Sequence, residues 1–135
     1  MTRTVSFAVL VLVLATARAS ADDAFVGKWV NVDDATRGLT RIEVWKRDKL
    51  TTIRAWGAAG RGEIDQGKVT LHLLGDSVAD RTLDHGFASW DHKFKETHVT
   101  LRLEKDRLIV EEFNIFKDDS GRSNYRSRYV FKPAR

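Results

Sequence analysis

Apolar and polar residues alternate with a period of two along most of this chain. Residues 97–104 place Val99, Leu101 and Leu103 on one face, with polar side chains between them. The same alternation recurs at residues 40–46, 68–74 and 124–132. Because successive side chains of a β-strand point to opposite faces, this pattern predicts half-buried strands rather than helices.

Turn-forming residues separate these runs at short, even intervals. Consecutive strands joined by short turns form an antiparallel meander, which removes its exposed edges by closing into a barrel. The predicted fold is therefore all-β, a single antiparallel up-and-down β-barrel of eight to nine strands that is lipocalin-like, with a two-sheet sandwich as the alternative. The expected strands are residues 26–32, 39–46, 50–56, 61–65, 67–74, 86–94, 97–104, 107–116 and 124–132.

The alternation also predicts which residues face the interior. A two-residue turn at Lys95-Glu96 would pair His92 with Val99 and place Trp90 and His92 on the inner face. Residues 75–86 form a longer connection, either a lid at one mouth of the barrel or an ordinary surface loop. The expected interior comprises Trp29, Ile42, Val44, Ile53, Val69, Leu71, Leu73, Trp90, Val99, Leu101, Leu103, Leu108, Val110, Tyr129 and Phe131.

The first 21 residues differ from the rest of the chain. Arg3 precedes nine apolar residues at 7–15, and Ala19-Ser20-Ala21 is a small-residue cleavage signal. This order is typical of secretory signals, so we expect a signal peptide at 1–21, a β-barrel domain at 22–135 and a secreted or periplasmic protein. We expect no integral membrane segment after cleavage, because no later apolar run is long enough to span a bilayer.

Composition narrows the function classes. The 135 residues include no cysteine, which excludes disulfides, thiolate metal sites and cysteine nucleophiles. Without Arg3 and Arg18 of the signal peptide, the formal net charge falls from +4 to +2. That small charge, together with export, argues against nucleic acid as the partner of the basic segment at 122–128.

The segment Gly27-Lys28-Trp29 resembles the first strand of the lipocalin and avidin barrels, the calycin type. The resemblance implies that Gly27 and Trp29 lie at the closed end of a barrel. It also implies that a basic residue of the last strand, Arg126 or Arg128, packs over the Trp29 indole through a cation–π contact. The chain lacks the other lipocalin motifs and the residues that line the avidin site, so the resemblance implies no biotin binding.

A closer resemblance is to a family of uncharacterised exported bacterial proteins, and it covers almost the whole chain after residue 21. Members of that family often carry a cysteine–histidine–proline segment with a second cysteine after an Ala-Trp-Gly motif. Here Ala58-Ala59-Gly60 stands at that place, so any disulfide or metal role of the segment is absent. The resemblance rests on residues 29–33, 36–42, 55–57, 94–97 and 119–123.

No motif in the sequence indicates catalysis, since G-x-S-x-G, H-E-x-x-H and P-loop patterns are absent. His92 is expected inside the barrel and His98 outside, so this pair cannot share a metal ion. We therefore expect no metal site, no cofactor and no enzymatic activity. The enzyme alternative would need His72, His85 or His92 beside Glu112, whose side chain is expected to point inward.

The leading hypothesis is a barrel that binds a small apolar ligand in its interior or at its mouth. Alternatively, the inward carboxylate is paired within the barrel by Ser127, Tyr125 or an arginine, because buried charges are usually paired. The second hypothesis is a solid barrel acting as a protein-interaction module, a protease inhibitor or an envelope-associated scaffold, through residues 22–25 or the arginines of the last strand. The ligand-binding residues of the first hypothesis are Tyr125, Ser127, Glu112, His92, Trp90 and Tyr129.

Overall fold

The structure, a computed structural model, describes residues 21–135. The expected signal peptide, except for Ala21, lies outside the described residues. The helical part of the described chain contains nothing long and apolar enough to cross a membrane. The elements are the 3₁₀ helix η1 (Ala21–Phe25) and the strands β1 (Gly27–Asn31), β2 (Leu39–Arg47), β3 (Leu50–Ala59), β4 (Gly62–Thr70), β5 (His72–Leu74), β6 (His85–Asp91), β7 (Lys95–Glu104), β8 (Arg107–Phe116) and β9 (Tyr125–Pro133).

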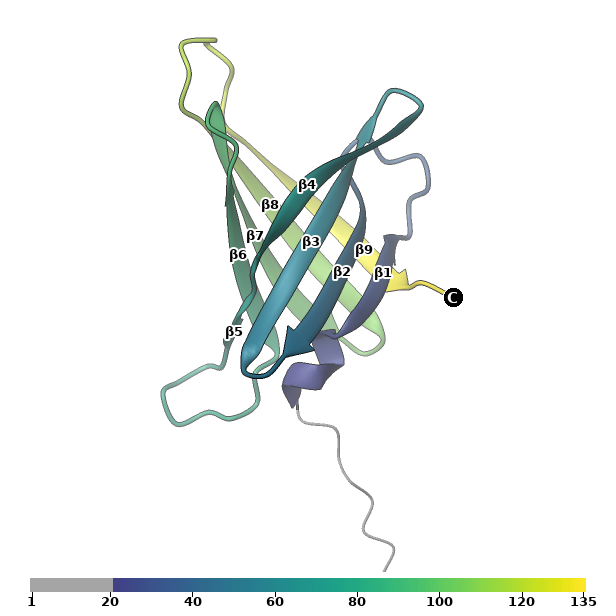
Figure 1. Ribbon diagram of the computed structural model, residues 1–135, viewed down its shortest axis with the longest axis vertical. Helices are drawn as coiled ribbons and strands as arrows, with labels where there is room; N and C mark the ends of the chain where they lie inside the picture. Colours follow the sequence, from purple (N-terminus) through teal and green to yellow (C-terminus); the bar gives the residue numbers. More distant parts are fainter. Residues whose placement is uncertain (1–20) are drawn as a thin grey trace, which may run out of the picture.

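The nine strands form one antiparallel sheet in the order β4-β3-β2-β1-β9-β8-β7-β6-β5. The sheet curls into a nearly closed up-and-down barrel, which confirms the fold class expected from the alternation (Figure 1). At the seam, β4 faces β6, and the Trp90 indole N–H donates a hydrogen bond to the Gly67 carbonyl oxygen at 3.0 Å. This side-chain hydrogen bond therefore links β4 and β6, which are not paired through backbone hydrogen bonds.

The two ends of the barrel differ. Helix η1, the β2–β3 hairpin and the connection between β5 and β6 lie at the lower end in Figure 1. Phe25 of η1 is fully buried, and its carbonyl oxygen accepts the Trp29 indole N–H at 2.9 Å, so this end is closed. The connections β3–β4, β6–β7 and β8–β9 lie at the opposite end, which we call the mouth (Figure 1).

Polarity along the interior changes from the closed end to the mouth. Paired residues on β7, β8 and β9 form four inward-facing layers, because the registers of the three strands align. The side chains of these layers become progressively more polar toward the mouth. From the closed end upward, the layers are Leu103–Leu108–Phe131, Leu101–Val110–Tyr129, Val99–Glu112–Ser127 and Thr97–Asn114–Tyr125.

Two local expectations are wrong. Asp91 pairs with Glu96 and the His92 N–H donates to the Lys95 carbonyl oxygen, so the β6–β7 turn lies at Lys93-Phe94, two residues before the expected turn. The register slips by an even number of positions, which keeps every side chain on its expected face. Residues 65–67 form a bulge within β4 rather than a turn, because Gly67 at φ 88° lets the strand continue past one extra residue.

The longer connection between β5 and β6 is not placed to cover the polar mouth. It joins Leu74 to His85 at the closed end, beside η1 (Figure 1). The Asp84 carbonyl oxygen accepts a backbone hydrogen bond from Leu103, which belongs to the most apolar interior layer. This segment is therefore a surface loop at the closed end. It is not a lid over the mouth, because it lies at the opposite end of the barrel.

Candidate functional site

The most polar interior layer lies at the mouth and contains an unsatisfied amide. The Thr97 hydroxyl donates to Asn114 Oδ1 at 2.8 Å, across the β7–β8 ladder. Asn114 is only 1% exposed, and its Nδ2 has no hydrogen-bond partner among the described residues. A buried amide donor without a partner costs free energy, so this atom is available to donate to an acceptor.

One layer deeper, a carboxyl group is held by a tyrosine. Glu112 is 8% exposed, and the Tyr129 hydroxyl donates to its Oε1 at 3.0 Å. Burial, with the added effect of the Glu112 charge, raises the pKa of Tyr129 to about 12. Gly38 makes room for this tyrosine, since a Cβ built at residue 38 would lie 2.0 Å from the tyrosine hydroxyl oxygen.

A small cavity joins the two polar layers. Its volume is about 10 Å³, which is room for one water molecule and no larger ligand. His92 also borders it, and its Nε2 atom is buried without a hydrogen-bond partner among the described residues. Larger hollows, of about 410 to 600 Å³, lie on the outer surface. The cavity is lined by Leu39, Ala55, Gln66, Trp90, His92, Thr97, Val99 and Glu112.

The surroundings of His92 at the mouth disfavour its charged form. Burial lowers the pKa of His92, and the positive charge of Lys95 lowers it further, whereas Asp91 acts in the opposite direction. A neutral imidazole offers one donor and one acceptor nitrogen. His92 is thus suited to hydrogen bonding with an uncharged polar group.

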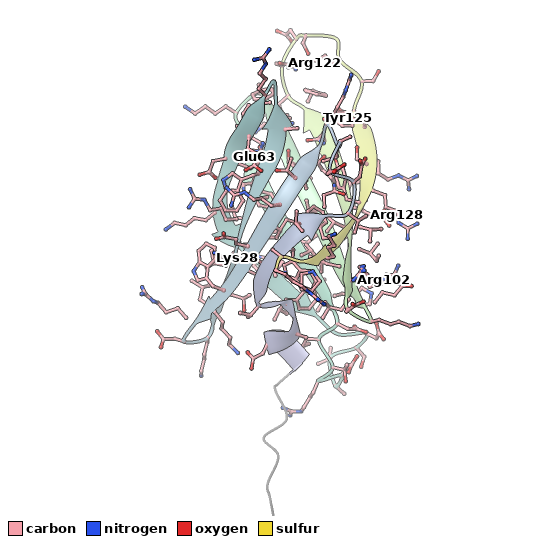
Figure 2. The ribbon with its side chains drawn as sticks, turned by 90° about the vertical axis from the view of Figure 1, so that its right-hand side faces the viewer. Lys28, Glu63, Arg102, Arg122, Tyr125 and Arg128 are labelled. Carbon is pink, nitrogen blue, oxygen red and sulfur yellow. The ribbon has the colours of Figure 1, made fainter. Side chains whose placement is uncertain are left out.

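Aromatic side chains and one arginine form a rim above the polar layer. The rings of Phe116 and Tyr125 lie 6.2 Å apart, and the Arg122 guanidinium carbon lies 4.3 Å from the centre of the Phe116 ring. The same guanidinium lies 5.3 Å from the ring of Phe94. Figure 2 shows Arg122 and Tyr125 at the same end of the barrel. Tyr125 is 49% exposed, so the rim presents an accessible aromatic surface.

The structure brings most of the expected ligand-binding residues to this end. His92, Glu112 and Trp90 border the cavity, and Tyr125 forms part of the rim. Ser127 pairs with Glu112 across the β8–β9 ladder and contacts the Tyr129 hydroxyl. The alternative in which a tyrosine pairs the Glu112 carboxyl group named Tyr125. In the structure the tyrosine that donates to Glu112 is Tyr129.

The expected packing of a last-strand arginine over Trp29 is not formed. Trp29 faces inward and pairs with Pro133, whereas Arg128 lies opposite Glu111 and points outward (Figure 2). Arg126, two residues before Arg128, is farther still from Trp29 along β9. Gly27 and Trp29 do lie beside η1 at the closed end, as the resemblance implies.

Cation–π packing occurs instead on the outer face of β2 and β3, where no pattern of the sequence predicts it. The Arg41 guanidinium carbon lies 3.6 Å from the centre of the Trp56 ring, and that of Arg54 lies 5.0 Å away. Arg41 also donates to Glu63 at 2.7 Å, and Arg54 is paired with Asp65. Because these contacts depend on the bulged registers of β2 and β4, alternation alone could not predict them.

The other histidines lie away from Glu112. His72 is exposed on β5, and His85 Nδ1 lies 2.7 Å from Asp84 Oδ1 at the closed end. Asp76 completes a group of three side chains whose ligand-type atoms lie within 4.8 Å of one another. Of the residues named for the enzyme alternative, only His92 borders the same cavity as Glu112.

No family model matches this chain, and no curated protein matches it either.

Proposed function

We propose that this protein is an exported, non-enzymatic barrel that binds a small, largely apolar molecule carrying one hydroxyl group at its open mouth. The observation that carries the proposal is the pair of unsatisfied buried atoms, Asn114 Nδ2 and His92 Nε2, beneath an aromatic rim. A hydroxyl group is both donor and acceptor. Such a group can accept a hydrogen bond from a buried amide or pair with a buried imidazole nitrogen.

The apolar part of the ligand stays at the rim rather than inside the barrel. The cavity below the rim holds about 10 Å³ of free space, which is less than any organic ligand occupies. Phe116 and Tyr125 offer ring faces for stacking, and the half-exposed Tyr125 is free on one side to turn toward solvent. This arrangement restricts the ligand to a flat molecule that lies on the rim with its polar group directed inward.

A fluorescence titration with 2-naphthol tests this function, with naphthalene as the matched probe that lacks a hydroxyl group. We expect 2-naphthol to bind at least about tenfold more tightly than naphthalene, since one satisfied buried hydrogen bond contributes about 1.5 kcal/mol. Tyr125→Ala should weaken binding, whereas Ile115→Ala, an exposed apolar change beside the rim, should not. Equal binding of the two probes, or equal effects of the two variants, would contradict the proposal.

Two observations favour the alternative function, in which a solid barrel acts through its outer surface. The interior is packed, and exposed cations gather on the outer face of β9. The version of this alternative that uses residues 22–25 as an exposed tail is disfavoured, because Phe25 is fully buried in the closed end. The outer face of β9 is then the surface through which such a barrel would act.

A further inference from the structure

A serine and a histidine meet on the outer face of the barrel. Ser89 of β6 pairs with His98 of β7 across the antiparallel ladder, and Ser89 Oγ lies 2.6 Å from His98 Nδ1. This is hydrogen-bond distance for a nucleophile and a general base. Neither residue borders the cavity below the rim, so the pair belongs to a different surface from the proposed ligand site.

A carboxylate contacts the other nitrogen of the imidazole. Glu96 lies two residues before His98 on the same face of β7, and its Oε2 is 3.3 Å from His98 Nε2. Because a carboxylate only accepts hydrogen bonds, this contact favours the neutral tautomer that carries its proton on Nε2. The lone pair of Nδ1 then faces the Ser89 hydroxyl group. The side chains thus have the order nucleophile, base and orienting carboxylate.

The carboxylate is itself positioned by a lysine. Lys117 Nζ lies 3.8 Å from Glu96 Oε1, and it also pairs with Asp91 Oδ1 at 2.7 Å. The lysine thus approaches the carboxylate oxygen that His98 does not use, so the two contacts do not compete. This pairing holds Glu96 beside the imidazole.

The ladder geometry leaves a backbone donor beside the serine. The His92 N–H donates to the Lys95 carbonyl oxygen at 2.9 Å, so these two residues form a hydrogen-bonded pair. Such pairs alternate with non-hydrogen-bonded pairs along an antiparallel ladder, which makes Ser89–His98 a non-hydrogen-bonded pair. The Ser89 N–H therefore points away from β7, to the side where β5 pairs only with residues 85–87. Neither ladder of β6 in the described sheet pairs this N–H, so it is available next to the hydroxyl group.

Apolar side chains flank the histidine on both neighbouring strands. The ring of Phe87 on β6 stacks on the imidazole, with ring centres 6.0 Å apart. On the other side, Phe113 of β8 pairs with His98, and the exposed Ile115 pairs with Glu96. The outer surface beside the serine therefore suits an apolar acyl group.

We propose that Ser89 is a nucleophile that His98 activates for acylation by aryl esters of apolar carboxylic acids. The hydroxyl oxygen attacks the ester carbonyl carbon, and its proton passes to His98 Nδ1. The Ser89 N–H donates to the oxyanion of the tetrahedral intermediate. The bond to the aryl oxygen then breaks, the phenolate leaves with the bonding electron pair, and the imidazolium releases its proton to solvent.

The reaction stops at one acyl group per chain. A phenolate is a much better leaving group than the serine alkoxide, so an aryl ester acylates Ser89 faster than water removes the acyl group. Ser89 is thus a site of covalent modification without turnover. This inference goes beyond the proposed function, because binding at the mouth requires neither Ser89 nor His98.

The test follows the release of 4-nitrophenolate from 4-nitrophenyl butyrate by the purified protein, and peptide mass spectrometry then locates the butyryl group. Ser89→Ala removes the nucleophile, and His98→Gln removes the base. The matched controls are Ser77→Ala and His72→Gln, an exposed serine and an exposed histidine elsewhere on the surface. Circular dichroism checks that every variant remains folded.

We expect a burst of one 4-nitrophenolate per chain, with the butyryl group on Ser89. The burst should be absent in Ser89→Ala, at least about 100-fold slower in His98→Gln and unchanged within about twofold in both controls. No burst in the unsubstituted protein, a butyryl group only on other residues, or a burst in Ser89→Ala or His98→Gln as fast as in the controls would overturn the inference. 2-Naphthol binding at the mouth should be the same before and after acylation, so the two proposals fail separately.

Glu96 acts through His98 and is a positioning residue. Glu96→Gln should slow the burst at least about tenfold, because the ring is no longer held in the tautomer that accepts the serine proton. The nitrogen NMR signals of the His98 imidazole should show the proton mainly on Nε2 in the unsubstituted protein and less so in the variant. An unchanged tautomer together with an unchanged burst would overturn this role of Glu96.

Discussion

The indole N–H of Trp90 donates to the carbonyl oxygen of Gly67 across the seam between β6 and β4, at 3.0 Å. Gly67 lies at the bulge of β4, where its positive φ turns the strand. The seam is thus held by one specific pair of residues as well as by the packing of the interior. This relationship has a direct consequence for stability.

Trp90→Phe keeps an aromatic ring at the seam but removes the donor to Gly67. We expect the variant to lose about 1–3 kcal/mol of unfolding free energy, because a part-buried carbonyl oxygen is left without its partner. Urea denaturation measures the loss, and Trp45→Phe on the outer face of β2 serves as the control. Equal unfolding midpoints for the two variants would show that the seam does not depend on this hydrogen bond.

Gly38 should tolerate no side chain. In Gly38→Ala, the new Cβ would meet the hydroxyl oxygen of Tyr129 at 2.0 Å and its ring carbon at 2.6 Å, so the tyrosine must leave Glu112. We expect a loss of about 1–3 kcal/mol in unfolding free energy from overpacking. In the control Gly62→Ala, the nearest atom lies 4.0 Å away, and its thermal melting temperature should change little. Similar melting temperatures for the two variants would contradict the packing described for Tyr129.

The two tyrosines should titrate at different pH values. Burial raises the pKa of both, and that of Tyr129 reaches about 12. In Tyr125→Phe, the single remaining tyrosinate absorbance transition should therefore be centred near pH 12. The additional variant Glu112→Gln should lower that midpoint, because it removes a negative charge beside the phenol. An unchanged midpoint would mean that the carboxylate does not act on Tyr129.

The raised pKa of Tyr129 also fixes the sign of its effect on stability. The unfolded chain releases this proton near pH 10 and the folded chain near pH 12, so the folded state binds more protons in between. The stabilising contribution is complete below pH 10 and is lost as the pH rises toward 12. Tyr129→Phe should abolish that part of the alkaline loss in a chemical denaturation series.

The lowered pKa of His92 predicts that the free energy of unfolding decreases at acidic pH. Its pKa is lowered below the ordinary value of 6.5 by burial and by Lys95, with Asp91 opposing. The folded state therefore binds fewer protons than the unfolded chain as the pH falls below 6.5, and stability declines there. His92→Gln should flatten the unfolding free energy between pH 7 and pH 5 relative to the unsubstituted protein. Identical pH profiles would contradict a buried, neutral His92.

Alternation predicted the interior because the face of a strand residue depends only on whether its position is odd or even. Every residue on the expected interior list belongs to the core or packs against it. The β6–β7 register was wrong, yet Trp90 and His92 kept their faces because the slip is even. Phe25 was missed because it lies in a 3₁₀ helix, and Leu39 because the bulge between Leu39 and Arg41 interrupts the alternation.

The site was predicted only in part, for a related reason. Glu112 and His92 were expected to face inward, and they do. Asn114 lies two residues after Glu112, so its inward position was available from the sequence. The sequence does not predict that Asn114 Nδ2 lacks a partner. That outcome depends on the pairing of Thr97 with Asn114 across two strands, and no local pattern determines this pairing. The rim around Arg122 likewise brings together two connections, β6–β7 and β8–β9, and the ends of two strands, β8 and β9.

The most direct test of the mouth site is the side-chain amide signal of Asn114 in a nuclear magnetic resonance titration with 2-naphthol. Asn31 is the internal control, because its buried Nδ2 already donates to the Leu39 carbonyl oxygen at 2.8 Å. We expect saturable shifts of the Asn114 amide and the His92 imidazole signals, with no shift of the Asn31 amide. Saturable shifts confined to the outer surface, or no saturable shift at all, would contradict a binding site at the mouth.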